Sequence, residues 1–378
     1  MIPTFLLLLP LAGPPASDKL PVTRLKPAVL FLEQCVYRYR IATPSPKCQD
    51  YFDQALGYYY SYVWMEAARS FETAVRHDPE CAMAHWGLAR ALERFGRGNA
   101  NASYQKAWDL RAKADPREQM LLRASMEEKG LIPGVGDGEA RKKKAIATID
   151  ELLATYDDDE EAWWFRAQLA GGSGLFGGQA SSVPFYKALL RINPLHPGAS
   201  HELVHFYENF GRPALGWKYA EAYIESSPGI PHPFHMQAHL ATRLGRWKLT
   251  AGRSARAVVL ERAYHKRENV KPKEDGQFQH HLDILLLALI HEGRFAEGRA
   301  IMKEMQECGW ENRETFFRLL LAERDYPAAL AMADKLKAGG GGKGKGRRRG
   351  GANKGAGAYC AALAHLAMKE PSRALPEL

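Results

Sequence analysis

Apolar residues recur every three or four positions along most of this chain, which is the spacing of one face of an α-helix. In residues 140–156, for example, Ile146, Ile149 and Leu153 fall on one such face. Residues 36–47 instead show alternation and two prolines without a helical period. We therefore predict an all-α protein, with helices that include residues 118–131, 140–156, 161–170, 251–264, 280–291, 295–308 and, as one pair, 313–336.

A second pattern lies over the helical one, because residues 194–247 contain the same sequence twice. Each matched pair lies 34 residues apart: Pro194 and Pro228, His201 and His235, His205 and His239, Gly211 and Gly245, Arg212 and Arg246. A period of 34 is that of the tetratricopeptide repeat, a pair of antiparallel helices that buries its apolar faces only by stacking on neighbouring pairs. The predicted fold is a right-handed α-solenoid of such helix hairpins.

Residues 48–81 carry the residue types of that repeat most completely, with Tyr51, Ala55, Tyr58, Ala67, Phe71 and Pro79 at the expected places. Several stretches resemble a bacterial family of tetratricopeptide-repeat proteins: IATPSP (41–46), YFDQAL (51–56), EAARSF (66–71), DPECAMAHWG (78–87), HPGASH (196–201) and HMQAHL (235–240). The resemblance covers most of residues 41–300, although Ala55 stands where the family usually has glycine. It implies a helical-repeat protein of undefined biochemical role.

The length of 378 residues exceeds the size at which a single core keeps growing, which fits a repeat array. We divide the chain into a signal peptide at 1–17, an N-terminal arm at 18–47, the repeat array at 48–336, a flexible Gly/Lys/Arg-rich loop at 337–357 and a helical remnant at 358–378. The first segment has a short apolar core followed by small residues. We therefore expect an exported protein, periplasmic or extracellular; the alternative is an uncleaved tail on a cytoplasmic one.

The net charge of +9 indicates little about function once its source is located. Six of the positive charges lie in the glycine-rich part of the loop at 337–357, on Lys343, Lys345, Arg347, Arg348, Arg349 and Lys354, and removing them from +9 leaves +3. The loop has no aromatic side chains between its basic ones, so we expect no specific nucleic-acid partner. No internal run is apolar enough to be a transmembrane segment.

Five cysteines bear on the expected compartment. A disulfide between Cys35 and Cys48 would tie the arm to the first helix, and export would permit it. Free thiols are the alternative, and Cys81 competes for Cys48. Cys308 and Cys360 lie in helical pattern, where small core residues are expected.

Histidines four residues apart in both copies of the repeat are the candidate chemistry, because residues four apart share one face of a helix. If the imidazoles of His201, His205, His235 and His239 met at one point, they would suit a divalent metal such as Zn²⁺ or Cu²⁺. Glu208, His232, His280 and Asp283 are the further ligands or supporting groups that this hypothesis allows. In the His-Glu-x-x-His motif of zinc proteases, the glutamate after the first histidine acts as the base. Glu202 follows His201 here, but Met236 follows His235, so the motif is only formally present.

The alternative is a concave groove for a peptide or protein partner, lined by the same histidines together with Tyr207, Arg243, His280 and Asp283. In a third interpretation the duplicated histidines only hydrogen-bond to neighbouring helices. No serine or cysteine lies in an activating context, so we assign no catalytic residues. We expect a scaffold or binding module rather than an enzyme, with metal binding as the alternative function.

Overall fold

The structure is a computed structural model that describes residues 19–171, 180–311, 314–338 and 350–377. Within these ranges every regular element is a helix, so the predicted all-α class is confirmed. None of the described helices has the length and apolar character needed to cross a membrane. The predicted signal peptide at 1–17, and residues 339–349 of the predicted loop, lie outside the described ranges.

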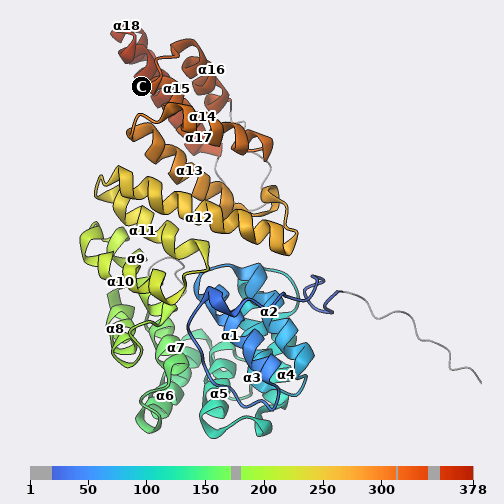
Figure 1. Cartoon of the computed structure of the whole chain (residues 1–378). Coiled ribbons are helices and arrows are strands. Elements are labelled where there is room, and N and C mark those ends of the chain that lie inside the picture. Colours follow the sequence, from blue (N-terminus) through green and yellow to red (C-terminus); the bar gives the residue numbers. More distant parts are fainter. Residues whose placement is uncertain (1–18, 172–179, 312–313, 339–349, 378) are drawn as a thin grey trace, which may run out of the picture. The chain divides into compact units, whose positions relative to one another are not determined.

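The chain forms two compact units. Unit 1 contains residues 38–157 and the arm up to residue 32, and unit 2 contains residues 33–37 and everything from residue 158. The helices of unit 1 are α1 (Pro46–Tyr60), α2 (Trp64–His77), α3 (Ala82–Phe95), α4 (Ala100–Asp109), α5 (Pro116–Lys129) and α6 (Gly138–Thr155), with a 3-10 turn at Arg111–Lys113. Consecutive helices pack as the hairpins α1/α2, α3/α4 and α5/α6 (Figure 1).

Unit 2 continues the pattern of helix hairpins (Figure 1). Its helices are α7 (Glu160–Gly171), α8 (Val183–Ile192), α9 (Pro197–Asn209), α10 (Pro213–Ser226), α11 (Pro231–Arg243), α12 (Trp247–Glu268), α13 (Gly276–His291), α14 (Phe295–Glu307), α15 (Glu314–Ala322), α16 (Tyr326–Lys337), α17 (Gly350–Ala367) and α18 (Pro371–Ala374). Short 3-10 turns occur at Leu32–Gln34, Ala180–Ser182, Pro272–Glu274 and Leu375–Glu377.

The 34-residue period predicted from the sequence is a structural period. Helices α9 and α11 begin at Pro197 and Pro231, and their partners α10 and α12 begin at Pro213 and Trp247. The first helices of successive hairpins, α9, α11 and α13, contact one another in turn. Each hairpin therefore buries its apolar face on the next one, as a helical repeat requires.

Three hairpin turns share one backbone geometry. Gly211, Gly245 and Gly293 have φ of 67°, 67° and 70°. The N–H of each following arginine donates to a carbonyl five residues back, at 2.8–2.9 Å, which is the bond that closes a helix end around a left-handed residue. A Cβ added at any of the three glycines would meet no atom within 4 Å. Glycine is required there for its backbone conformation and not for lack of space.

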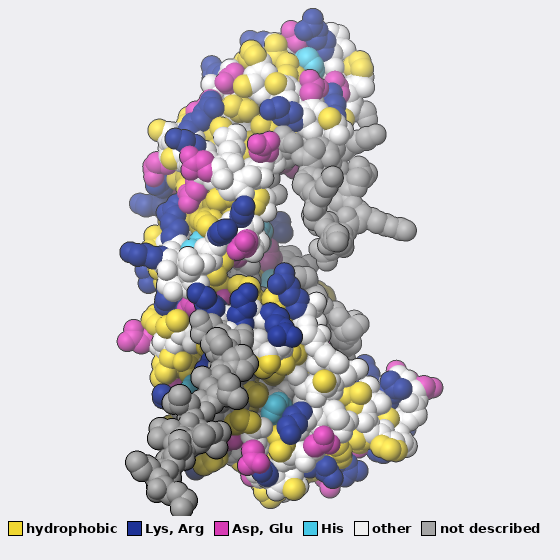
Figure 2. All heavy atoms as spheres, turned by 90° about the vertical axis from the view of Figure 1, so that its right-hand side faces the viewer, with side chains coloured by type: hydrophobic (Ala, Val, Ile, Leu, Met, Phe, Trp, Pro, Cys, Tyr) yellow, Lys and Arg dark blue, Asp and Glu magenta, His cyan; other side chains and the backbone are white. Residues whose placement is uncertain are grey.

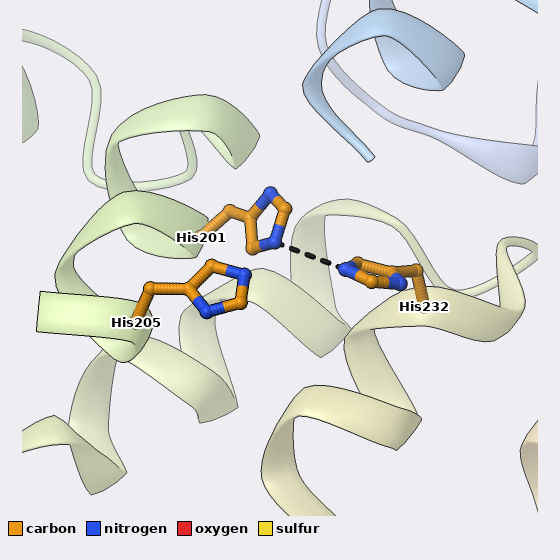
Figure 3. A group of neighbouring side chains, drawn as sticks. All are labelled: His201, His205 and His232. Carbon is orange, nitrogen blue, oxygen red and sulfur yellow. Dashed lines mark hydrogen bonds between the residues drawn. The ribbon is translucent and has the colours of Figure 1, made fainter. Parts of the chain in front are cut away.

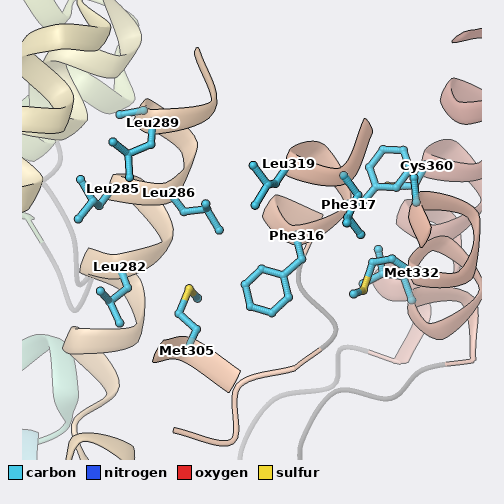
Figure 4. Packing of buried hydrophobic residues seen from close by; sticks show 14 of the residues in the cluster. Leu282, Leu285, Leu286, Leu289, Met305, Phe316, Phe317, Leu319, Met332 and Cys360 are labelled. Carbon is cyan, nitrogen blue, oxygen red and sulfur yellow. The ribbon is translucent and has the colours of Figure 1, made fainter. Parts of the chain in front are cut away.

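The core of the last hairpins is a continuous apolar cluster (Figure 4). Leu282 and Leu286 of α13 point toward Met305 of α14 and Phe316 of α15, all at most 1% exposed. Cys360 is buried in the same cluster, and Cys308 packs against it partly buried. Both cysteines are therefore small core residues, as the sequence predicted.

Two predicted boundaries were wrong. Helix α12 continues to Glu268, past residue 264 where the predicted helix ends, because its basic last turn suits a helix C-terminus. Helix α17 begins at Gly350, although residues up to 357 were expected to form a loop. A Cβ at Gly357 would lie 2.5 Å from the backbone nitrogen of Lys337. That glycine lets α17 approach α16 closely and serves packing rather than flexibility.

The extended arm is attached to unit 1 by side chains that accept hydrogen bonds from its backbone. Glu72 accepts from the N–H of Thr23 at 2.8 Å, Asp53 from Tyr39 at 3.1 Å and Glu118 from Ala42 at 2.8 Å. The three carboxyl groups are almost completely buried. They replace the neighbouring strand that an extended segment would otherwise need.

The described residues show no disulfide between Cys35 and Cys48, and the bond stays a prediction. Cys35 belongs to the short segment 33–37 of unit 2, and its sulfur accepts from the hydroxyl of Ser227 at 3.4 Å. Cys48 lies in α1 beside Cys81, within 4.8 Å between ligand atoms.

We predict that Gly245→Ala lowers the free energy of unfolding by about 1 kcal/mol, because alanine is strained at positive φ. Gly252→Ala is the matched control: Gly252 is exposed inside α12, so alanine there should raise stability by about 0.5–1 kcal/mol. Urea denaturation of the three proteins measures both effects. Equal stability of Gly245→Ala and the parent would contradict the assigned turn.

The arm generates a pH prediction. Burial raises the pKa of Asp53 to about 7, against its reference value of 3.8. Below about pH 4 the carboxyl is protonated in both the folded and the unfolded protein. Between about pH 4 and 7 only the unfolded protein loses the proton. The free energy of unfolding therefore falls as pH rises through this window, by at most about 1.4 kcal/mol per pH unit. In Asp53→Asn this loss should be smaller. Denaturation of both proteins between pH 4 and 8 tests this, and identical slopes would refute it.

Candidate metal centre

Helix α9 is set in place by a histidine that takes no part in the candidate site. The Nδ1 atom of His196 accepts from the N–H of Ala199 at 3.1 Å and caps the helix, with Pro197 in its first turn. Its ring lies against Tyr37, with centroids 4.7 Å apart. Burial lowers the pKa of His196 to about 3. The cap is therefore a neutral imidazole at pH 7.

Three histidines meet between α9 and α11, and we call them the inner trio: His201, His205 and His232 (Figure 3). One ring nitrogen of each lies within 4.8 Å of those of the other two. The Nε2 atoms of His201 and His232 are 3.0 Å apart. His201 and His232 are buried and His205 is half-buried.

A second group lies between α11 and α13, and we call it the outer trio: His235, His239 and His280. The Nε2 atom of His239 is 2.9 Å from that of His235 and 3.2 Å from that of His280. Two ligand nitrogens bound at 2.0–2.1 Å to one tetrahedral zinc ion are about 3.3 Å apart. The two distances from the central nitrogen are therefore already close to those in a metal's ligand set. His235 is buried, His239 half-buried and His280 exposed.

The predicted single meeting point of His201, His205, His235 and His239 was wrong. The two pairs sit on neighbouring repeats, and packed helix axes are about 8–10 Å apart, so equivalent side chains lie side by side rather than at one point. Each pair instead finds its third partner on the next first helix: His232 of α11 for the first pair and His280 of α13 for the second.

A carboxylate supports the outer trio from α9. Glu208 Oε1 lies 3.0 Å from Nδ1 of His239 and 3.2 Å from Nε of Arg243. Burial acts to raise the pKa of Glu208, but the hydrogen bond with His239 and the positive charges around it prevail and lower it to about 2. An ionised carboxylate only accepts, so Nδ1 of His239 carries the hydrogen. In neutral His239 the Nε2 lone pair then faces His235 and His280.

Sequence reasoning missed a polar network behind the outer trio. His281 is buried, its ring centroid is 4.4 Å from that of His235, and its Nδ1 lies 2.9 Å from Glu261. Burial raises the pKa of Glu261 well above its usual value, and Asp275 in turn lies 2.9 Å from His265. The adjacent histidines 280 and 281 were the only sequence signal, since no motif pairs Glu261 with Asp275, 14 residues later.

Two of the predicted groove residues contact other side chains instead of the histidines. Tyr207 stacks on Tyr219, with ring centroids 5.7 Å apart. Asp283 accepts a hydrogen bond from the hydroxyl of Thr315. Arg243 does reach the site through Glu208, and both line a hollow with Gly211, Arg212, Pro213, Ala214, Leu215 and Leu244.

On the face shown in Figure 2, Lys and Arg side chains occur beside Asp and Glu side chains, and histidines reach the surface at scattered points.

No protein-family model matches this chain, and no curated protein matches it. Among solved structures it is similar to "MamA 41-end" from Desulfovibrio magneticus RS-1, at 12% identity and a TM-score of 0.37, over 52% of this chain and 96% of that one. It is also similar to yeast Tom70, at 13% identity and a TM-score of 0.38, over 92% of this chain and 70% of that one. Such values carry no functional argument; the fold assignment rests on the hairpins and their 34-residue spacing.

The capping histidine generates a prediction of opposite sign to that for Asp53. The folded pKa of His196, about 3, lies below its reference value of 6.5. The contribution of neutral His196 to the free energy of unfolding is therefore complete above pH 6.5. It is lost as pH falls, by at most about 1.4 kcal/mol per pH unit. His196→Asn keeps a capping side chain without the titration, so its stability should fall less between pH 6.5 and 4. Urea denaturation with EDTA present tests this; a slope as steep as the parent's would contradict it.

Proposed function

We propose that this helical-repeat protein binds a divalent transition-metal ion through the outer trio. The observation that carries the proposal is the convergence of three Nε2 atoms, 2.9 and 3.2 Å from the central one, with Glu208 on the far nitrogen of that central ring. A carboxylate behind a ligating histidine fixes its tautomer and orientation in metal sites generally.

The donor set favours particular metals. Neutral imidazoles suit Zn²⁺ and Cu²⁺, whereas Mg²⁺ and Ca²⁺ prefer oxygen ligands. Burial and the neighbouring histidines lower the pKa of His235 well below its usual value, so this ligand is neutral and ready to bind. Three protein ligands leave one position for water or for a group of a partner. Glu208 is already engaged by His239 and Arg243, so its role is to hold a ligand and not to act as a base.

The proposal predicts that the purified protein retains metal and that added Zn²⁺ raises its melting temperature. His239→Ala should reduce this rise, because the Nε2 atom of His239 lies closest to both other ligand nitrogens of the outer trio. Glu208→Gln should weaken Zn²⁺ binding by about 10–100-fold while keeping the shape of the side chain. Elemental analysis and titration calorimetry measure these effects.

The control is His291→Ala, which removes a histidine of α13 that stacks on Trp247 outside both trios. It should bind Zn²⁺ like the parent. Absence of bound metal, together with a Zn²⁺-induced melting shift that His239→Ala leaves unchanged, would sink the proposal.

A second candidate function is binding of a peptide or protein, which the hollow beside Glu208 favours. Arg212 and Leu215 at its edge are exposed, and so is neighbouring Phe210. Apolar side chains next to two arginines suit a partner segment that combines an apolar residue with acidic ones.

Leu215→Asp should reduce binding of such peptides selected from a random library by at least tenfold. Val259→Asp is its matched control, because Leu215 and Val259 are both 51% exposed but Val259 lies on α12 away from the hollow. Fluorescence anisotropy measures both. Equal binding by the two variants would remove the hollow as the binding site.

A further inference from the structure

We infer that the inner trio is a second site for the same class of metal ion, so that the protein holds two ions in neighbouring repeats. The inference rests on the proposed function of the outer trio and extends it. Its basis is that His201, His205 and His232 form the same constellation as the outer trio, one repeat earlier in the chain.

The equivalence can be followed residue by residue. His201 and His205 lie 10 and 6 residues before the turn glycine Gly211, and His235 and His239 lie 10 and 6 residues before Gly245. The third members match as well: His232 lies 13 residues before Gly245, and His280 lies 13 residues before Gly293. These glycines close equivalent turns with the same backbone hydrogen bond. Each site thus takes two histidines from one first helix and one from the next.

The hairpins before and after the two trios lack the histidines that a further trio would need. On α13 the positions of the histidine pair are occupied by Asp283 and Leu287, and Asp283 is bonded to Thr315. On α9 the position equivalent to His232 is Gly198. Histidines at these places are therefore not a general requirement of the repeat. Histidines occupy these positions only where two adjacent first helices together supply all three members of a trio.

The geometry of the inner trio fits a metal. The ring of His201 lies 4.7 Å, centroid to centroid, from the rings of both His205 and His232, and the three rings are turned toward one another (Figure 3). Burial lowers the pKa of His205 to about 4 and that of His232 well below its usual value. These imidazoles are neutral at pH 7, as ligands must be.

The two sites are close enough to influence each other. The rings of His232 and His235, one from each trio, are 5.6 Å apart, and His281 lies beside both. Two divalent ions so placed repel each other in a partly buried setting. We therefore expect the sites to fill in sequence. The outer trio, which includes the exposed His280, should exchange its ion faster than the inner trio, in which two residues are buried and one is half-buried.

The test counts bound Zn²⁺ per chain after equilibrium dialysis, using the full chain. We expect two equivalents for the parent and for the control His291→Ala, one each for His205→Ala and His280→Ala, and none for the double variant. With Cu²⁺ in place of Zn²⁺, magnetic coupling between the ions should broaden the electron paramagnetic resonance signal of the parent but not of either single variant. Circular dichroism checks folding; His205→Gln, which keeps a polar side chain, is the second variant if His205→Ala is unfolded.

The outcomes separate the two proposals. One equivalent in the parent that His280→Ala removes and both His205 variants leave in place would overturn the second site and leave the outer site standing. No bound Zn²⁺ in the parent would overturn both. Two equivalents that are insensitive to His205→Ala and to His205→Gln would place the second ion elsewhere and also overturn this inference.

Discussion

The structure depends on the inability of one helix hairpin to bury its own apolar face. Each first helix must lie against the first helix of the next hairpin, as α9, α11 and α13 do. This contact fixes which side chains of consecutive repeats become neighbours. It brings His232 to the pair on α9 and His280 to the pair on α11, so the packing that stabilises the array also builds the candidate metal centre.

Buried carboxyl groups of unit 1 and buried imidazoles of unit 2 titrate with opposite effects on stability. Unit 1 buries carboxyl groups that serve the arm: burial raises the pKa values of Asp53 and of Glu118 to about 7. Unit 2 buries imidazoles, and burial lowers the pKa values of His196 and His281 to about 3. Burial favours the neutral form in both cases. Mild acid therefore strengthens the carboxyl contributions in unit 1 and weakens the imidazole contributions in unit 2.

Much of the fold followed from the sequence, because the helical period and the 34-residue repeat are local signals. The turn glycines were found in the same way, although the reason for them is backbone conformation.

The grouping of the histidines was not predictable, since spacing along a helix says which residues share a face but not which residue of the next helix completes the set. The adjoining residues Glu261 and Asp275 come from the end of α12 and the start of α13, where the pattern of charges gave no pairing. The carboxylates that hold the backbone of the arm, Asp53 and Glu118, were not predictable for the same reason.

The division of each trio between two hairpins bears on how such a site arises in evolution. Duplication of one hairpin copies two histidines on its first helix together with the turn glycine that sets their register. The new pair is incomplete until the following hairpin carries a histidine 13 residues before its own glycine, as α11 and α13 do. Sites of this kind can therefore be gained one at a time at a repeat boundary, by a single substitution on the downstream neighbour. The same substitution on an isolated hairpin would have no partner, so selection on the site acts on pairs of repeats and helps to retain their order.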